Sequence, residues 1–417
     1  MKYSRLAIAR LTGGCKSVSV KCALLNAAFF VLLGAVSTNA AEAPITNCNA
    51  VSCAGSAGAY KFLAIPDIVR AGGGTDNNIA TAMTWDKAKY LPEGEAVEMQ
   101  KLLKDLAQND KYRYVKALTD LAPTDSMELV GITQDLNNLI SKQIAIRMNR
   151  RGINSGYSFD NQWIKTLYNE SKQDENDKSY GFDGKTAGIA LGTDGKISAN
   201  TTAGIGYAYN KSDVDSLDRS IKVYGNTFFT YGKYQPADWY ILGLVHYGYA
   251  KYREKNYIRH LAGKAKYGVQ NYGARAYLGY FFGNGFLAET GLRYTRVDRR
   301  SYTDSFDQHV KTDGIDVLTG TIGLNYLTNI PYGKFIWSPR ARFVATYDIV
   351  SDDSNSTVSI GDGIYNITGK RLNRLGMEVG AGLGLGYGKW EFSLEYDFGA
   401  RKDYVSHTES LNVKYNF

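Results

Sequence analysis

The sequence predicts an all-β fold: an antiparallel transmembrane β-barrel of roughly twelve strands, with an α-helical plug and a short N-terminal helical and irregular segment. Over residues 156–417, apolar and polar residues alternate in runs that are often about nine residues or longer, enough to cross a bilayer at a tilt. Aromatic residues gather beside the turns, as they do at bilayer interfaces. A secreted β-sandwich would also alternate, but strand length and aromatic placement favour the barrel.

The first 41 residues predict a secretory signal peptide. Five basic residues precede "CALLNAAFFVLLGAV", an apolar run broken only by Asn26, and small residues follow in "STNAAEA". This order of a basic, an apolar and a small-residue region is typical of an exported protein, and we expect cleavage after Ala40 or Ala41.

Charge and cysteine content restrict the partners. The chain has 49 basic and 41 acidic residues, but cleavage of the signal peptide removes five basic and no acidic ones. The remaining net charge is small, so no nucleic-acid partner is expected.

Of the four cysteines, Cys48 and Cys53 follow the signal peptide and predict a small disulfide loop. They lack His or Cys neighbours, so we expect no metal site. No apolar stretch of about 18 residues follows the signal, so a membrane crossing must use strands.

The N-terminal part of the exported chain divides into three predicted segments. Residues 42–92 are small and polar, which predicts an irregular, passenger-like segment. Residues 93–123 predict a helical linker, because "GEAVEMQKLLKDLAQ" and "DKYRYVKALTDLAP" each place apolar residues on one helical face. Residues 124–150 predict one helix on the order of 35 Å long. Its polar residues, such as Asp135 and Lys142, exclude contact with lipid, so this helix must lie in a polar lumen.

The barrel strands are read from period-two alternation over 156–417. In "EFSLEYDF", Phe392, Leu394 and Tyr396 alternate with polar residues, and "RLGMEVGAGLGLGY" alternates apolar residues with glycine and Glu378. The glycines of the latter, with Gly204 and Gly206, are expected to make lumenal room for the helix. Longer polar loops are expected at "YREKNYIRHLAGKAK", "DSFDQHVKTDG" and "VSDDSNSTVSIGDG".

The last strand has one apolar face, formed by Leu411, Val413, Tyr415 and Phe417. A closed barrel has no edge, so this strand is expected to pair with the first and to turn that face to lipid. A terminal aromatic after alternating apolar positions also resembles the signature by which bacterial outer-membrane proteins are recognised for assembly.

Residues 94–417 resemble the translocator domains of autotransporters, the type V secretion proteins of Gram-negative bacteria. The resemblance lies in "NQWIKTLYNES", "SYGFDGKTAGIALGTD" and "TTAGIGYAYNKSDVDS" as opening strands, and in "YVKALTDLAPTDSMELV" before them. It implies a twelve-stranded outer-membrane barrel whose lumenal helix leads a passenger to the cell surface. It also implies contact with outer-membrane lipid, lipopolysaccharide, the secretion translocon and the outer-membrane assembly machinery, and no cofactor. Passengers of this family are usually long β-solenoids. In this chain only about eighty residues, without an internal repeat, lie between the signal peptide and the predicted plug helix, so a passenger enzyme is not expected.

Two features bear on chemistry. "DLNNL" contains Asn137 and Asn138, and some autotransporters cut their helix between two asparagines; a lumenal carboxylate such as Glu378 or Glu395 would assist proton transfer. The alternative is an uncut, hydrogen-bonded plug. His246, His260, His309 and His407 are scattered over strands and loops, which favours solvated positions over a catalytic cluster. We therefore expect no catalytic residues and no enzyme activity.

The function that we expect is export or display of a short N-terminal segment through the chain's own barrel. The alternative is a surface adhesin or evasion barrel that binds a host ligand through its outer loops; the locally basic "EKNYIRHLAGKAKY" would suit polyanions. A pore-forming porin is the third hypothesis.

Overall fold

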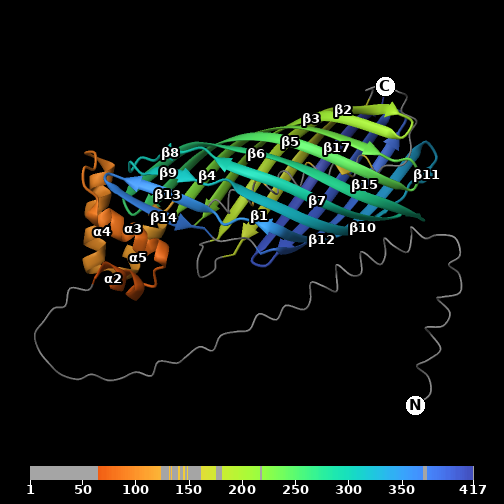
Figure 1. The fold of residues 1–417 in the computed structure, drawn as a ribbon. Coiled ribbons are helices and arrows are strands. Elements are labelled where there is room, and N and C mark those ends of the chain that lie inside the picture. Colours follow the sequence, from red (N-terminus) through yellow and green to blue (C-terminus); the bar gives the residue numbers. More distant parts are fainter. Residues whose placement is uncertain are drawn as a thin grey trace, which may run out of the picture. The chain divides into compact units, whose positions relative to one another are not determined.

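The computed structural model describes most of the chain after residue 63 (Figure 1). The described residues are 64–123, 131, 133, 140, 144, 145, 148, 161–174, 181–216, 218–369 and 373–416. The predictions for Ala40, Ala41, Cys48, Cys53, Asn137, Asn138 and Phe417 lie outside these residues and stay predictions.

Twelve of the strands in the described part of the chain close into an antiparallel barrel, which confirms the predicted fold class. Neighbouring strands follow chain order around the wall, β10 pairs with β12, and β1 pairs with β17 from Asn161↔Asn416 to Gln173↔Tyr404. The wall consists of β1 (Asn161–Gln173), β2 (Phe182–Ser198), β3 (Thr201–Ser216), β4 (Arg219–Tyr234), β5 (Trp239–Ile258), β6 (Leu261–Gly283), β7 (Phe286–Arg299), β10 (Ile315–Leu327), β12 (Phe335–Ser351), β15 (Leu375–Tyr387), β16 (Trp390–Arg401) and β17 (Tyr404–Asn416).

The wall is apolar outside, and part of its inner face is polar. On β16, Phe392 and Leu394 are exposed on the outer face, whereas Glu391, Ser393 and Glu395 are buried towards the lumen. On β17, Leu411 is exposed on the face that was predicted to contact lipid, and the lipid contact itself stays a prediction. This distribution is the inverse of a soluble protein and is the one that a bilayer requires of a barrel.

The two ends of the barrel differ, and we name them by their connections. The turn end holds the start of β1, the end of β17 and short turns such as 199–200 and 284–285. The loop end holds the connections 300–314 and 352–374, which contain further strands. A three-residue strand, β11 (Ile330–Tyr332), pairs with β12 at the turn end.

A four-stranded sheet, which we call the outer sheet, is built from the loop-end connections. Its strands are β8 (Tyr302–Thr303), β9 (His309–Thr312), β13 (Asn355–Ile360) and β14 (Gly363–Thr368). The sequence predicted polar loops at these positions, and that prediction is wrong. The polar runs conceal buried apolar positions, including Val310, Val358 and Tyr365, which suffice to form short strands once a partner covers them.

The basic stretch "YREKNYIRHLAGKAK" is also not a long loop. β5 and β6 continue through it and meet at a two-residue turn, Arg259–His260, where Arg259 has a φ of 55°. Its charged side chains conceal an alternation in which Ile258, Leu261 and Ala265 are buried while Lys255 and Lys264 are exposed.

Four helices precede the barrel and form what we call the helical bundle: α2 (Ile65–Ala71), α3 (Asp76–Lys87), α4 (Glu95–Asn109) and α5 (Lys111–Leu121). The two helices predicted over 93–123 are present, but the irregular segment predicted over 42–92 is wrong for its described part, which contains α2 and α3. A capping box between Thr75 and Asn78 starts α3, and the Asp110 side chain caps α5 through the N–H of Arg113. The low apolar content of α3 hid it from sequence analysis.

None of the helices among the described residues is long and apolar enough to cross a membrane.

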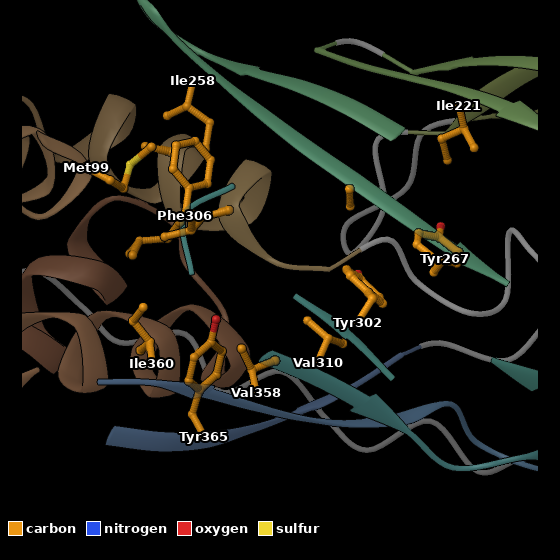
Figure 2. Close-up of a cluster of buried hydrophobic side chains, with 14 of the residues drawn as sticks. Met99, Ile221, Ile258, Tyr267, Tyr302, Phe306, Val310, Val358, Ile360 and Tyr365 are labelled. Carbon is orange, nitrogen blue, oxygen red and sulfur yellow. The ribbon is translucent and has the colours of Figure 1, made fainter. Parts of the chain in front are cut away.

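The bundle and the loop end share one apolar core. Val69, Trp85, Met99 and Leu118 from the bundle are buried in the same cluster as residues of the outer sheet and of the strand ends. Figure 2 shows part of this cluster, with Met99 of α4, Ile258 of β5 and Phe306 of the β8–β9 connection gathered together. The bundle is therefore packed onto the loop end.

Candidate functional site: the barrel lumen and its loop end

The segment between the bundle and β1 is described at six residues, several of which contact the inner face of the wall. Gly131, Thr133, Ile140, Ile144, Ala145 and Met148 are helical, and all but Met148 are buried. Ile140 and Ile144 pack in a cluster with inward-facing Trp163, Leu167 and Phe229 of the wall. The predicted lumenal helix is thus seen at its described residues, whereas its predicted bounds, 124–150, stay untested.

Two contacts give the direction of this segment. Lys233, at the turn end of β4, donates a hydrogen bond of 2.7 Å from Nζ to the carbonyl oxygen of Met148. Thr133 shares a side-chain hydrogen bond with Tyr252, which lies towards the loop end of β5. The described residues therefore run from Thr133, towards the loop end, to Met148 at the turn end.

Aromatic rings form an apolar wall beside the lumenal segment, and each ring lies over a glycine of a neighbouring strand. A Cβ on Gly206 would come within 2.4 Å of the Phe229 ring, and one on Gly204 within 2.4 Å of the Tyr231 ring. The same relation holds for Gly192 with Trp163, Gly279 with Tyr240 and Gly291 with Tyr277. Gly204 and Gly206 therefore make room for rings that line the lumen, rather than for the helix directly as predicted.

Gly206→Ala is expected to destabilise the barrel by about 1–3 kcal/mol, because the added methyl group forces the Phe229 ring out of its position. Gly243→Ala is the matched control, since a Cβ there meets nothing within 4 Å. The temperature at which the folded band disappears in semi-native electrophoresis measures the effect. Equal temperatures for the two variants would contradict this role of Gly206.

An ionic wall made by β1, β7, β12, β15 and β16 forms the other part of the lumen. Glu395 accepts from Lys165 Nζ at 2.8 Å and lies 2.9 Å from Arg340 Nη1. Glu378 pairs with Arg293 at 2.8 Å and with Arg342 at 3.3 Å, and Arg342 also reaches Asp397 at 2.9 Å. These side chains are buried or nearly so, and an unpaired charge would be costly there. Each carboxylate is compensated by at least one cation.

The glycines of β15 make room for this wall. A Cβ on Gly380 would approach Asp397 Oδ1 to 2.5 Å, and one on Gly382 would approach Glu395 Cγ to 2.9 Å. The carboxylates of β16 therefore extend across the bare backbone of β15 to the arginines of β12. This use of the glycine-rich run was not predicted.

Glu378 and Glu395 were predicted as helpers of cleavage at Asn137 and Asn138. In the structure both carboxylates are held by two cationic side chains, and these ion pairs account for their presence in the lumen. The cleavage itself stays a prediction.

The histidines do not come together. His260, His309 and His407 are exposed, as predicted, and His407 Nδ1 lies 2.7 Å from the Tyr396 hydroxyl. His246 differs from the prediction of a solvated position, because it is buried on the lumenal side of β5. Among the described residues, no group of three or more His, Cys, Asp or Glu side chains is placed to hold a metal ion.

At the loop end, Gln308 joins the bundle to the outer sheet. Its side chain is 1% exposed, and its Oε1 accepts from Trp85 Nε1 of α3 at 3.3 Å and from the Tyr365 hydroxyl of β14 at 2.6 Å. Its Nε2 donates to the carbonyl oxygen of Leu121 at 3.1 Å and to Asp304 Oδ2 at 2.8 Å. The amide is thus fully used by groups on four separate segments.

Asp304 holds Gln308 in place, and its carboxyl has a pKa above the usual range of aspartate. Its Oδ1 accepts from the backbone N–H groups of Phe306 and Gln308, each at 2.9 Å. Burial raises the pKa of its carboxyl to about 6, and Glu254 adds to the rise, against the lowering by the Gln308 and Phe306 hydrogen bonds. In the unfolded chain an aspartate has a pKa near about 3.9, so the packed state binds a proton more tightly.

Packing of the bundle is therefore expected to strengthen as the pH falls from about 7 towards 4, and to weaken as the pH rises through about 6. Protease cleavage within the bundle of the purified protein should be about three- to tenfold slower at pH 5 than at pH 7.5. Asp304→Asn should remove this dependence. A dependence that persists in the variant would assign the effect to a group other than Asp304.

These features define the class of protein: a closed transmembrane barrel whose own N-terminal segment occupies the lumen. The autotransporter β-domain family matches residues 162–397, more than half of the chain, and the chain belongs to this family.

Relatives and solved structures agree with this family. The chain is 20% identical over 287 residues to outer membrane protein A of Rickettsia conorii and 23% identical over 284 residues to outer membrane protein B of Rickettsia typhi. These matches cover 61% of this chain but only 14% and 17% of those much longer proteins. The translocator domain of the autotransporter NalP from Neisseria meningitidis has the same fold, with a TM-score of 0.59 at 17% identity, and the match covers 71% of this chain and all of that one.

The chain is accordingly an autotransporter translocator domain of the outer membrane, and its fold is that of a transport domain. The cations of the ionic wall and Gln308 were not predicted from the sequence. The alternation along β1 could have indicated Lys165, because it lies in phase with Trp163 and Leu167, which face the lumen. No such pattern indicated Gln308, since its partners come from segments that only the fold brings together.

Proposed function

We propose that this barrel carries its own N-terminal segment through its lumen to the cell surface, and that the helical bundle is displayed there. The observation that carries the proposal is the direction of the chain. The barrel begins and ends at the turn end. Met148 of the lumenal segment is bonded at that same end, whereas the bundle lies at the loop end.

The orientation of outer-membrane barrels supports this direction. Bacterial barrels have short turns in the periplasm and longer loops outside, so the loop end with its outer sheet faces the exterior. An exported chain reaches the barrel from the periplasm. The bundle must then cross the membrane to reach the loop end, and the path that the described lumenal residues follow is the lumen.

The lumen has surfaces suited to hold an amphipathic helix after passage. Ile140 and Ile144 pack on the apolar wall, and the ionic wall provides paired charges that tolerate polar side chains such as Asp135 and Lys142 of the sequence. Burial of apolar side chains, at about 25 cal/mol per Å², provides a driving force that requires no nucleotide.

Cysteine labelling on intact cells tests the proposal. In a chain with Cys48 and Cys53 replaced by serine, Tyr112→Cys places a thiol on α5 at the loop end, and Tyr332→Cys places one on β11 at the turn end; these tyrosines are 74% and 75% exposed. A membrane-impermeant maleimide should label the first in intact cells and the second only after permeabilisation. Protection of Tyr112→Cys in intact cells would contradict display.

The partners expected from the resemblance, namely lipopolysaccharide, the secretion translocon and the assembly machinery, belong to this proposal. The alternative of an adhesin or evasion barrel that binds a host ligand stays a prediction. The basic stretch that was predicted as its binding loop consists of the paired strands β5 and β6. The exposed lysines of these strands face outward.

A further inference from the structure

The bundle's apolar core is completed by the barrel. Trp85 of α3 and Met99 of α4 are essentially inaccessible to solvent, and both lie in the cluster that includes Phe306, Val358 and Ile360 of the loop end. Figure 2 shows these loop-end side chains turned to the helices. If the bundle were separated, both surfaces would expose contiguous apolar area, which soluble proteins avoid.

The edge of the outer sheet is also fitted to the bundle. Asn77 of α3 uses its side-chain amide as a strand would use its backbone: Nδ2 donates to the Thr368 carbonyl oxygen at 2.9 Å, and Oδ1 accepts from the Thr368 N–H at 3.3 Å. After α3, the N–H of Lys89 donates to Asp362 Oδ1 at 2.7 Å. The bundle thus covers a strand edge that would otherwise be free to pair with other chains.

A third set of contacts fixes the C-terminal end of α5 on the barrel. Arg219 of β4 donates to the carbonyl oxygens of Asp120 at 3.1 Å and Ala122 at 2.7 Å, and Asn256 of β5 donates to that of Asp120 at 2.8 Å. These are the terminal carbonyls that a helix leaves without intrahelical partners. The barrel rim therefore supplies the C-terminal cap of α5.

From these contacts we propose that the bundle is a retained lid of the barrel rather than a cargo for release, and that the outer sheet is its dedicated docking surface. Non-covalent contacts alone suffice to hold α2 and α3 on the barrel. This inference rests on the proposed function for its biological setting, but the retention itself is a property of the folded chain and is measured separately.

The test cuts the covalent link and asks whether the lid stays. Pro92, Glu93 and Gly94 are exposed between α3 and α4, so a protease recognition sequence inserted after Gly94 in the otherwise complete chain is accessible. The purified protein is cleaved in detergent and passed over a gel-filtration column. The fragment that carries α2 and α3 should elute with the barrel, and its elution as a free fragment would overturn the proposal.

Variants separate docking from a general folding defect. With the cleavage site present, Trp85→Ala should release the fragment at least tenfold more than the parent, whereas Tyr112→Ala, on the exposed side of α5, should not. Semi-native electrophoresis confirms in each case that the barrel is folded. Equal retention of the Trp85→Ala fragment would show that the proposed surface does not hold it and would likewise overturn the proposal.

The experiment also distinguishes the two claims. A lid that is retained in detergent but is not labelled from outside intact cells would leave the retention standing and would contradict display. A lid that is labelled from outside but dissociates after cleavage would leave export standing and would overturn the retention.

Discussion

Glu395→Ala is expected to reduce the amount of folded barrel in the outer membrane by at least tenfold. The change leaves Lys165 buried, with 4% of its side chain exposed, without the carboxylate that pairs with it at 2.8 Å, and removes a partner of Arg340. Loss of one partner of a buried ion pair costs about 3–5 kcal/mol, a large fraction of the stability of an ordinary domain. Heat-modifiable mobility of outer-membrane fractions measures the folded fraction.

Two further variants make this result specific. Glu409→Ala removes a carboxylate from the exposed face of neighbouring β17 and should leave assembly unchanged. Glu395→Asp keeps the charge and should restore part of the folded fraction. If Glu395→Ala assembled as well as Glu409→Ala, the ionic wall would not stabilise the barrel.

Phe306→Ala is expected to loosen the helical bundle while the barrel stays intact. The Phe306 side chain has no exposed surface, and it contributes to the core between the bundle and the loop end. Truncation of a buried phenylalanine costs about 3–5 kcal/mol. Because Phe306 lies in the β8–β9 connection, outside the paired strands of the wall, the cost falls on the packing of the bundle.

Limited proteolysis of the purified protein measures this effect. Cleavage within α2–α5 should be accelerated at least tenfold in Phe306→Ala, with an unchanged folded barrel on semi-native gels. Tyr112→Ala serves as the control, because surface substitutions are usually within about 0.5 kcal/mol of neutral. Unchanged bundle cleavage in Phe306→Ala would contradict the shared core.

The barrel was predictable because a bilayer imposes a simple rule on every strand. Alternation along "EFSLEYDF" identified the outward Phe392 and Leu394, and the inward Glu395 followed from the same period. The lumenal position of Ile140 and Ile144 was predictable for a similar reason: a long apolar stripe with Asp135 and Lys142 beside it in the sequence fits neither lipid nor a free surface.

The loop end was not predictable, because its order depends on contacts between distant segments. β13 and β14 are short and polar in sequence, and they are strands because the bundle and β9 cover them. α3 has little apolar character, and its place is fixed by Trp85 and Asn77, whose partners lie 223 and 291 residues away. Local periodicity carries no information on such pairings.

The occupation of the lumen by the chain's own N-terminal segment is tested most directly by a cross-link inside the lumen. Ile144→Cys and Leu167→Cys place thiols on two buried residues of one lumenal cluster, and a protease site inserted between residues 150 and 156 separates the helix from the barrel after cleavage. In the chain with Cys48 and Cys53 replaced by serine, oxidised outer membranes should yield a disulfide-linked pair of fragments that separate on reduction. The outward Leu394→Cys, paired with Ile144→Cys, should yield none. Absence of the Ile144–Leu167 cross-link in folded barrels, or an equal yield with Leu394→Cys, would contradict a lumen occupied by the chain's own helix.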